Sequence, residues 1–237
     1  MILNIVDFLK SNKYLVMALL ILIMLIFVLL LWYIKNKTKK TTVKEVSIIG
    51  IFTGFSIVLY FIKFNIPIFP PFLEIHFSLL PIIIAGFMMS PTHGILIVLL
   101  RTIIKMFFTT TFCVGEIADF IIGVSVVGAT SLIYKKYHTK KGALVSLLVG
   151  IITWVVVGCI SNYFINIPFY IQLYCNGDIE MFIQYLSVIP GITKENYLWR
   201  YIVYACIPFN LILSVMVNLI TFLVYKKISI LFHKIEY

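Results

Sequence analysis

Residues Phe64–Pro91 read FNIPIFPPFLEIHFSLLPIIIAGFMMSP, and long apolar segments lie on both sides of them. The first part of this stretch is rich in proline and aromatic residues, which favours an extended loop over a helix. The second part is a hydrophobic run that is short for an ordinary membrane-spanning helix. A rigid loop that closes the end of a helix bundle predicts a lid over a small-molecule pocket.

The composition is that of a membrane protein. The chain has 237 residues, of which 62% are hydrophobic and only 12% are charged. A soluble domain carries about 25% charged residues. The apolar residues fall into runs of about 20, the length that crosses the hydrocarbon core as a helix. The formal charge of +10 lies in short clusters between these runs, which favours membrane topology over nucleic-acid binding.

The apolar segments predict a two-part organisation. Tyr14–Ile34 contains no charged residue and is too long for a signal-peptide core, so it is predicted to be a retained helix. With its basic linker it makes up residues 1–45, and residues 46–237 form a six-helix membrane domain. The expected fold is an all-α membrane protein, a six-transmembrane-helix bundle with one additional N-terminal helix. The six segments of the bundle are Val46–Ile62, Phe77–Met89, Thr92–Phe108, Ile117–Tyr134, Ala143–Ile165 and Tyr201–Tyr225.

Lysine and arginine indicate the orientation, because they gather on the cytoplasmic side of membrane proteins. Three basic clusters alternate with loops poor in positive charge, so all three fall on one side when the six helices cross in order. The C-terminus is therefore predicted to be cytoplasmic, and the residues before Tyr14 to lie outside. The clusters are Lys35–Lys44, Lys135–Lys141 and the tail after Tyr225; the loops are Lys63–His76, Thr109–Gly115 and Asn166–Trp199.

The loop Asn166–Trp199 is the longest of the outer loops. It contains two turn signals, Asn176-Gly177-Asp178 and Pro190-Gly191. Between them, Ile179–Leu186 is expected to form a short surface helix.

The sequence lacks a catalytic signature. The motifs of metalloproteases and serine hydrolases are absent, and no cofactor or metal site is expected. Gly123–Gly128 has the glycine spacing of a phosphate-binding loop, but it has no lysine and lies in an apolar helix, which favours helix packing. The chain therefore cannot hydrolyse ATP itself. An integral-membrane enzyme and a purely structural scaffold remain the alternatives from other functional classes.

Ionisable side chains within membrane helices are costly and usually face a cavity or a partner. Arg101 and Lys105 stand four residues apart on one helical face, and Glu116 and Asp119 stand three apart on the next helix. A short loop joins the two helices, so both pairs are expected to meet near the outer membrane face. They would form either a structural ion-pair cluster or part of a polar binding site.

Two asparagines are the other polar candidates. Asn162, followed by Tyr163, lies at the outer end of the fifth segment of the bundle, and Asn210 lies in the outer half of the sixth. Buried amides need hydrogen-bond partners. Two amides at matching depth beside aromatic residues suit a flat heterocycle, although a helix–helix hydrogen bond is the alternative. Phe72 and His76 of the lid are also candidate contacts.

Small residues suggest where helices approach one another. Gly50 and Gly54 form a G-x-x-x-G pattern on the first segment of the bundle, which indicates either internal packing or docking of another membrane subunit. The four cysteines show no C-x-x-C spacing and are expected to be small core residues. A disulfide between Cys113 and Cys175 is a minor alternative.

Six short motifs occur in an order that resembles a known family. From about Val46 to His233 the chain resembles the substrate-binding S component of an energy-coupling factor (ECF) vitamin transporter, and it is most similar to the riboflavin-binding type. The motifs are Ile68–Leu73 leading into Phe77-Ser78, Gly115–Phe120, Leu132–Lys136, Thr139–Ala143, Ser161–Phe164 and Ile207–Ile212.

This resemblance implies a six-helix bundle that holds a vitamin near the outer face under the first loop. It also implies association with a transmembrane T subunit and two cytoplasmic ATPases, which power a toppling of the S component in the bilayer. Gly50 and Gly54 lie about where the family carries a motif for docking the T subunit.

The chain departs from the family pattern at several positions in the implied pocket. The family's Asp-Phe-Ser-Asp reads His76-Phe77-Ser78-Leu79 here, and its Asn-x-x-Lys on the last helix reads Asn210-Leu211-Ile212-Leu213. A Lys-Asn on the third helix is Arg101-Thr102 here, and the span Tyr14–Ile34 has no counterpart. The resulting hypothesis is a subunit that binds riboflavin or a related flavin and helps to import it. The alternative ligand is another vitamin or heterocycle.

Overall fold

The computed structural model describes residues 22–23, 25–26, 42–109 and 111–234. Each of the six segments predicted after residue 45 forms a helix within this part of the chain. The predicted helix Tyr14–Ile34 falls almost wholly outside the described residues and stays a prediction. The six helices are α3 (Val43–Phe61), α4 (Leu79–Met88), α5 (Pro91–Met106), α6 (Val114–Lys136), α7 (Lys140–Ser161) and α11 (Ile207–Lys234).

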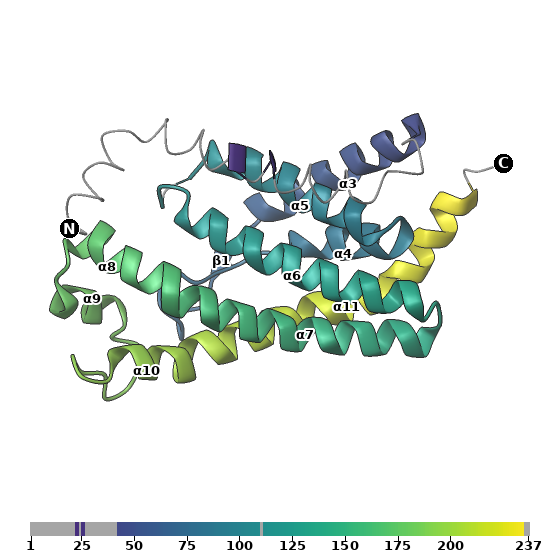
Figure 1. Cartoon of the computed structure of the whole chain (residues 1–237). Coiled ribbons are helices and arrows are strands. Elements are labelled where there is room, and N and C mark those ends of the chain that lie inside the picture. Colours follow the sequence, from purple (N-terminus) through teal and green to yellow (C-terminus); the bar gives the residue numbers. More distant parts are fainter. Residues whose placement is uncertain (1–21, 24, 27–41, 110, 235–237) are drawn as a thin grey trace.

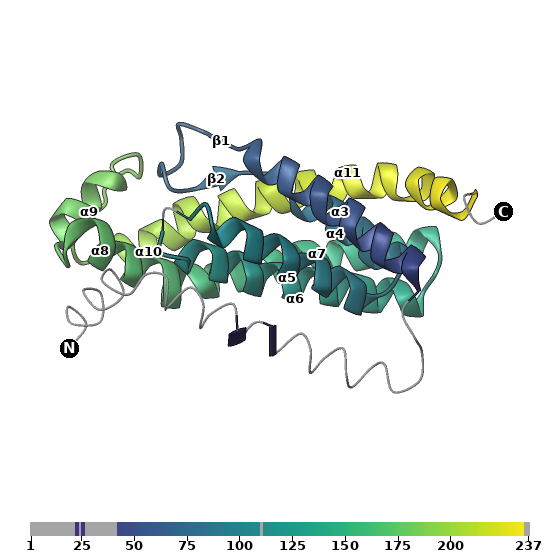
Figure 2. The same cartoon turned by 90° about the horizontal axis from the view of Figure 1, so that it is seen from above.

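Shorter elements are gathered at one end of the elongated bundle (Figures 1 and 2). The opposite end holds the start of α3, the connection between α6 and α7, and the end of α11. The two ends of the described structure therefore differ, because the first carries most of the short elements. Its elements are the strands β1 (Phe64–Asn65) and β2 (Glu74–Ile75), the helices α8 (Ile167–Cys175), α9 (Ile179–Tyr185) and α10 (Tyr197–Tyr201), and the π-helical turns η1 (Asn162–Asn166) and η2 (Ile202–Cys206).

Four helical stretches in the described part of the chain are long and apolar enough to cross a membrane. The π-helical turns interrupt two of these stretches without ending them, so α7 continues into α8 and α10 continues into α11. Helices α4 and α5 are shorter, at 10 and 16 residues. The four stretches are Val43–Phe61, Val114–Lys136, Lys140–Cys175 and Tyr197–Ile228.

The short helix α4 lies in the centre of the bundle, where it packs against α3, α5, α6 and α11. It is apolar on every side, and eight of its ten residues are buried. A helix that is hydrophobic all round suits an apolar surrounding, and here the neighbouring helices provide it. Pro81 falls in the first turn, where a missing backbone N–H costs little, so the proline does not break the helix.

Local capping explains where two helices begin. Helix α3 begins three residues before its predicted start because Thr42 and Glu45 form a capping box, in which each side chain accepts a hydrogen bond from the other residue's backbone N–H. Helix α7 begins after Thr139, whose hydroxyl accepts from the backbone N–H of Gly142 at 2.9 Å.

The outer segment after Asn166 is more ordered than the predicted loop. Helix α8 extends the preceding helix to Cys175, and the turn at Asn176-Gly177 then has positive φ at both residues. The short helix expected over Ile179–Leu186 is confirmed as α9. However, α9 is not a simple surface helix, because Phe182 is only 1% exposed. This segment therefore packs against the end of the bundle.

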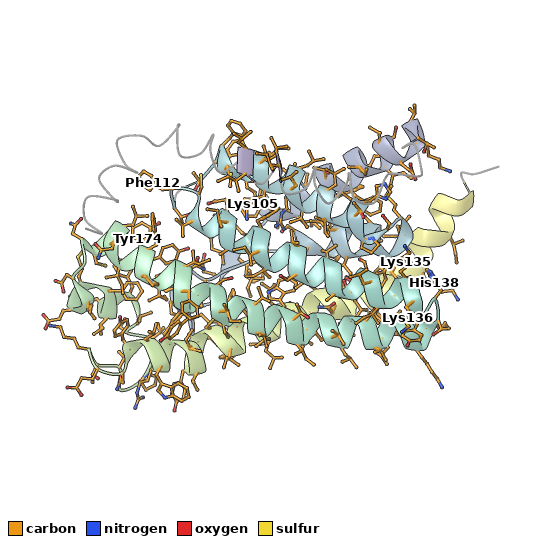
Figure 3. The ribbon with its side chains drawn as sticks, viewed as in Figure 1. Lys105, Phe112, Lys135, Lys136, His138 and Tyr174 are labelled. Atoms are coloured by element: carbon orange, nitrogen blue, oxygen red, sulfur yellow. The ribbon has the colours of Figure 1, made fainter. Side chains whose placement is uncertain are left out.

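The basic residues Lys135 and Lys136 lie with His138 at the end of the bundle that also holds the C-terminal part of α11 (Figure 3). Lys105 lies in the other half of the molecule (Figure 3). The cluster around Lys135 and the end of α11 thus share one end of the described structure, whereas most of the cluster Lys35–Lys44 falls outside the described residues. That this end faces the cytoplasm stays a prediction.

Candidate binding site

The proline-rich segment forms a braced hairpin over one end of the bundle. Strands β1 and β2 pair antiparallel, and Lys63 forms an ion pair with Glu74 at 2.7 Å. The amide of Asn65 donates to the backbone oxygens of Pro71 and Leu73 at 2.6 and 3.3 Å. These bonds hold the prolines in one conformation without regular secondary structure. We call residues 63–78 the lid.

A cavity of about 250 Å³ lies beneath the lid. Lid residues form one side of it, and residues of α3, α4, α5, α6, α7, η1, α8 and α11 form its other walls. Most of the site residues predicted from the sequence line this single cavity, although they come from five separate regions of the chain. They are Phe72, His76, Arg101, Lys105, Glu116, Asp119, Asn162 and Asn210.

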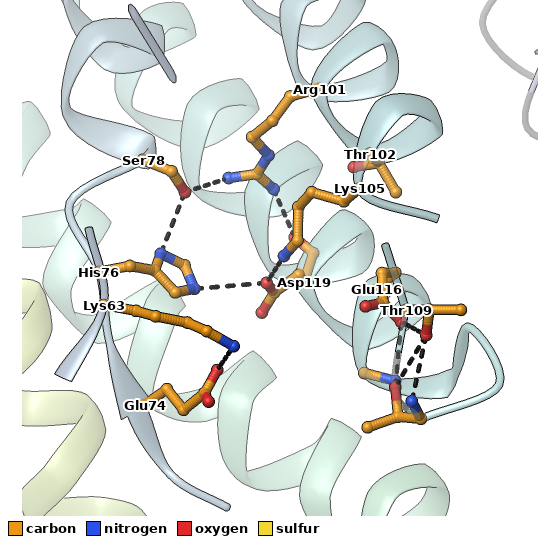
Figure 4. A network of polar contacts seen from close by, with 12 residues as sticks. Lys63, Glu74, His76, Ser78, Arg101, Thr102, Lys105, Thr109, Glu116 and Asp119 are labelled. Carbon is orange, nitrogen blue, oxygen red and sulfur yellow. Dashed lines mark hydrogen bonds and ion pairs between the residues drawn. The ribbon is translucent and has the colours of Figure 1, made fainter. Parts of the chain in front are cut away.

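Asp119 is the centre of a polar network on one wall of the cavity (Figure 4). Lys105 donates to its carboxylate, and the Nε2 atom of His76 lies 3.5 Å from the same oxygen. Arg101 donates to Ser78 Oγ at 2.7 Å and to the backbone oxygen of Asp119 at 3.5 Å. The two cations expected to approach the acidic helix therefore do so, and the lid is tied to the same network through His76.

The second carboxylate of that helix has different partners. Glu116 does not pair with Arg101 or Lys105; it accepts from the hydroxyls of Thr109 and Thr111 at 2.8 and 3.0 Å (Figure 4). Both bonds reach the same oxygen, Oε2. The connection between α5 and α6 thus fixes the carboxylate of Glu116 at the edge of the cavity.

A stripe of residues spaced four apart follows one face of the α7–η1–α8 stretch. Asn162, Asn166, Tyr170 and Tyr174 all line the cavity, and Trp154 does so two turns earlier. In a regular α-helix a four-residue spacing drifts steadily around the axis, because one turn takes 3.6 residues. The π-helical turn at Asn162–Asn166 has i→i+5 bonds and turns more slowly. It therefore keeps the stripe on the cavity side.

The amide of Asn162 is fixed by the protein itself. Its Nδ2 donates to the backbone oxygen of Gly158 at 2.9 Å, and its Oδ1 accepts from Tyr201 Oη at 2.7 Å. Asn166 Nδ2 also approaches that Oδ1, at 3.4 Å. Asn166 Oδ1 is buried and has no partner in the described part of the chain. Both a cavity contact and a helix–helix hydrogen bond are thus present at Asn162.

Asn210 lies across from the same glycine. Its Nδ2 donates to the backbone oxygen of Cys206 at 2.8 Å. A Cβ atom on Gly158 would come within 2.8 Å of Asn210 Oδ1, so α7 can approach this amide only because residue 158 is glycine. The two asparagines predicted to share a depth in the membrane therefore meet at one position on α7.

Comparison with known proteins identifies this architecture. The family model for the substrate-specific component of ECF transporters matches residues 44–225. The chain belongs to this family. It is accordingly a multi-pass membrane protein and a transporter subunit, rather than an enzyme or a structural scaffold.

Curated relatives and a solved structure resemble this S component over most of its length. It is 30% identical over 186 residues to riboflavin transporter RibU of Staphylococcus aureus, which covers 78% of this chain and 90% of the relative. Riboflavin transporter FmnP of Bacillus subtilis is 25% identical, over 79% of this chain and 93% of the relative. A solved S component of a bacterial ECF transporter is 28% identical, with a TM-score of 0.60, and covers 78% of this chain and 95% of its own.

One of the site residues predicted from the sequence lies away from the cavity. Tyr163 is 46% exposed and its ring contacts Phe164. It follows Asn162 directly, so it points to a different side of the helix. The structure thus places Asn162 and the next residue of the stripe, Asn166, at the cavity, and it places Tyr163 outside.

Several lining residues were missed from the sequence. Tyr60 packs its ring against the Lys105 ammonium, 3.8 Å from the ring centroid, and contacts the ring of His76. Tyr170 and Tyr174 were missed because the sequence predicted a loop after Asn166. Their four-residue spacing from Asn162 is the signal that could have found them. Nothing in the linear sequence indicated that Trp154 or Phe209 would face the cavity.

The cysteines and glycines also have defined positions in the S component. Cys175 is a buried free thiol, so the Cys113–Cys175 disulfide is not formed in this structure. At Gly50 and Gly54 an added Cβ would meet nothing within 4 Å. Neither glycine is needed for packing inside the described bundle, which leaves their outer face open on α3.

Proposed function

We propose that this S component binds riboflavin at the outer membrane face and delivers it inward as part of an ECF importer. The relatives described above are riboflavin transporters by name, and the family supplies substrate-specific components. The cavity beneath the lid is the observation that carries the proposal. Its lining of aromatic rings, amides and charged groups suits a flat aromatic ligand with a polar edge and a hydroxylated chain.

The charges around the cavity favour an uncharged ligand. Its lining contains three cations and three carboxylates, so the formal charges cancel. Burial lowers the pKa of His76, which keeps that ring neutral at neutral pH. A net charge on a ligand would lack an opposite charge among the lining residues, because their own formal charges already cancel. Riboflavin is uncharged at neutral pH, whereas several other vitamins carry charge. The six charged groups are Lys63, Arg101, Lys105, Glu74, Glu116 and Asp119.

The departures from the family pattern are consistent with this balance. Leu79 and Leu213 occupy the positions where the family carries an acid and a lysine, and both line the cavity. His76 replaces a second acid of the family pattern, so two acids and one lysine are lost. The formal charges that remain around the cavity still cancel, and the two leucines make part of its wall apolar. The proposed ligand can therefore stay the same while its contacts change.

We assign the lining residues to different parts of the ligand. Phe72, Trp154 and Phe209 provide aromatic surface for the ring system. Asn210 and Asn166 provide amide groups for its polar edge, and Asn166 Oδ1 lacks a donor that a ligand N–H could supply. The Glu116 carboxylate, held by two threonines, can accept from ligand hydroxyls.

Energy for import must come from other chains. The S component lacks ATP-hydrolysis motifs, so we propose that it associates with a transmembrane T subunit and two cytoplasmic ATPases. In this proposal the C-terminus is cytoplasmic, and the residues before Tyr14 lie outside. The open face of α3 around Gly50 and Gly54 is the proposed contact with the T subunit.

The proposal predicts that the purified protein binds riboflavin. Protein from a host supplied with riboflavin should be yellow, and riboflavin added to the ligand-free protein should lose fluorescence as it enters the aromatic cavity. A colourless preparation that does not quench added riboflavin would reject the proposal. Mass spectrometry of small molecules that co-purify would then identify the vitamin or heterocycle that is bound instead.

Riboflavin 5′-phosphate should bind more weakly than riboflavin. The phosphate adds about two negative charges, and the charges that line the cavity already cancel. We expect the dissociation constant to rise by about tenfold or more, because an unpaired charge is costly to bury. Competition titrations with the two flavins give this ratio directly. Equal affinities would show that the charge balance does not select the ligand.

Asn210→Leu should weaken riboflavin binding while leaving the fold intact. Leucine has nearly the same shape, but it removes the polar contacts of the ligand edge, at a cost of about 1–3 kcal/mol or roughly five- to 150-fold in affinity. Fluorescence titration and thermal unfolding measure the two effects.

Asn218→Leu is the matched control for this substitution. Asn218 lies two turns further along α11, donates to the backbone oxygen of Ser214 at 2.8 Å and faces Gly150, yet it does not line the cavity. This variant should bind riboflavin as the wild type does. Unchanged affinity in Asn210→Leu would remove Asn210 from the site.

A further inference from the structure

The ring of Phe72 in the lid contacts three aromatic rings of the segment that follows η1. Its ring centroid lies 5.5 Å from that of Tyr170, 6.1 Å from that of Phe182 and 5.8 Å from that of Tyr201. The ring of Phe182 is stacked on it, with an angle of 21° between the planes. We call Tyr170, Phe182 and Tyr201 the socket of the lid. These residues lie on α8, α9 and α10, about 100 residues or more from Phe72 in the sequence.

Phe182 differs from the other members of the socket. It is 1% exposed and does not line the cavity, so it can touch the ligand only through Phe72. Tyr170 lines the cavity directly, and Tyr201 holds the amide of Asn162 through its hydroxyl. Phe182 is therefore the socket residue whose contact with the binding site runs through the lid alone.

Other attachments of the lid to the bundle lie on either side of Phe72. The ring of Phe69 contacts that of Phe209 at 5.4 Å, and His76 reaches Asp119. At the end of the lid, Ser78 Oγ accepts from Arg101 and the Ser78 backbone oxygen accepts from Ser56, both at 2.7 Å. The bonds from Asn65 and Lys63 stay within the lid itself. The socket therefore supplies the ring contacts that hold the part of the lid around Phe72.

We propose that Phe182 is a positioning residue that holds Phe72 in the closed lid and thereby sets how long a ligand stays bound. The effect on the ligand rests on the function proposed above, whereas the effect on the lid does not. Opening the lid must separate the stacked pair, but the pair need not be formed while a ligand enters. Loss of the pair should therefore raise the dissociation rate and leave the association rate nearly unchanged.

Phe182→Leu tests the effect on the lid without any ligand. Leucine keeps the position apolar and filled, but it removes the stacked ring. Hydrogen–deuterium exchange of the lid amides, including Phe69 and Leu73, which donate to Ile66 and Pro70, reports lid opening. Loss of one stacked aromatic pair is expected to raise the population of the open lid about two- to twelvefold. We expect lid exchange to speed up by this factor in the variant, with exchange in α6 and α11 unchanged. Unaltered lid exchange would overturn the proposal.

Phe87→Leu is the matched control. Phe87 is also buried and stacked, on Tyr134 at 4.2 Å, but Tyr134 contacts the ring of His138, which lies at the other end of the bundle (Figure 3). The same substitution there should leave lid exchange as in the wild type. If Phe87→Leu speeds lid exchange as much as Phe182→Leu does, the effect is general destabilisation and the assignment of Phe182 fails.

Riboflavin kinetics test the consequence for binding. In stopped-flow fluorescence, Phe182→Leu should raise the dissociation rate about two- to twelvefold and change the association rate less than twofold. The same substitution in a Phe72→Leu background should add no further increase, because the two residues act as one pair. Additive effects would overturn the assignment. Failure of the wild type to bind riboflavin would reject the proposed function, while the exchange experiment would still decide the role of Phe182 in the lid.

Discussion

Asp119→Asn should weaken riboflavin binding severely and lower the stability of the protein. Lys105 is 3% exposed and Arg101 is 1% exposed, and Asp119 is the carboxylate that Lys105 contacts. Removing one partner of a buried ion pair leaves an uncompensated charge, which costs about 3–5 kcal/mol. Part of this cost should appear as a lower unfolding temperature, and part as a loss of affinity of about 100-fold or more. Flavin titration and thermal unfolding in detergent measure both.

Two further variants separate charge from shape. Glu180→Gln makes the same chemical change in the exposed pair between Glu180 and Lys194, and it should have little effect. Lys105→Gln combined with Asp119→Asn restores the balance of charge around the cavity. The double variant should therefore be more stable than Asp119→Asn alone. The buried network would be contradicted if Asp119→Asn had little effect on affinity and unfolding temperature. It would also be contradicted if the two substitutions lowered the stability additively.

The same substitution should also change ligand preference. Asp119→Asn leaves the cavity with one more cation than carboxylates. The affinity for riboflavin 5′-phosphate should then rise relative to that for riboflavin, whatever the absolute loss. A ratio that stays as in the wild type would indicate that the charges of the cavity do not act on the ligand.

Gly50→Leu combined with Gly54→Leu should abolish riboflavin uptake without affecting riboflavin binding. Within the described residues, an added Cβ at either position meets nothing within 4 Å, so two leucines fit there and even favour the helix. The same leucines would prevent the close approach of a helix from a T subunit. Uptake of labelled riboflavin should therefore be lost, and the T and ATPase subunits should no longer co-purify. The isolated S component should keep its affinity.

Gly128→Leu is the control for this double substitution. Gly128 lies on α6 and also has nothing within 4 Å of an added Cβ, but it is far along the chain from α3. This variant should assemble and transport. If the α3 variant instead loses riboflavin binding together with assembly, the two glycines serve the internal structure of the S component and are not a docking surface.

The sequence alone predicted much of the site, because spacing on a helix fixes which side chains share a face. Arg101 and Lys105 are one turn apart, Glu116 and Asp119 are nearly so, and a short loop brings the two helices together. The extended loop of the lid was also predicted, because several prolines close together disfavour a helix. Hydrophobic length located the helices, since the bilayer requires a minimum apolar span.

The tertiary structure decided the partners within these groups. Glu116 pairs with Thr109 and Thr111 because the α5–α6 connection folds back over it, and no spacing rule gives that contact. Tyr163 lies outside the cavity and Asn166 lies within it because a π-helical turn occurs there. No pattern of residues in the sequence predicted this π-helical turn.

By itself, the sequence determined a membrane bundle with a rigid lid and a few polar groups near one end, because hydrophobic length, proline geometry and helical periodicity are local properties. Only the tertiary structure decided that the charges around the cavity cancel and that Phe72 meets Phe182. Both depend on contacts between segments far apart in the chain. Such contacts follow from how whole helices pack, so no local pattern encodes them.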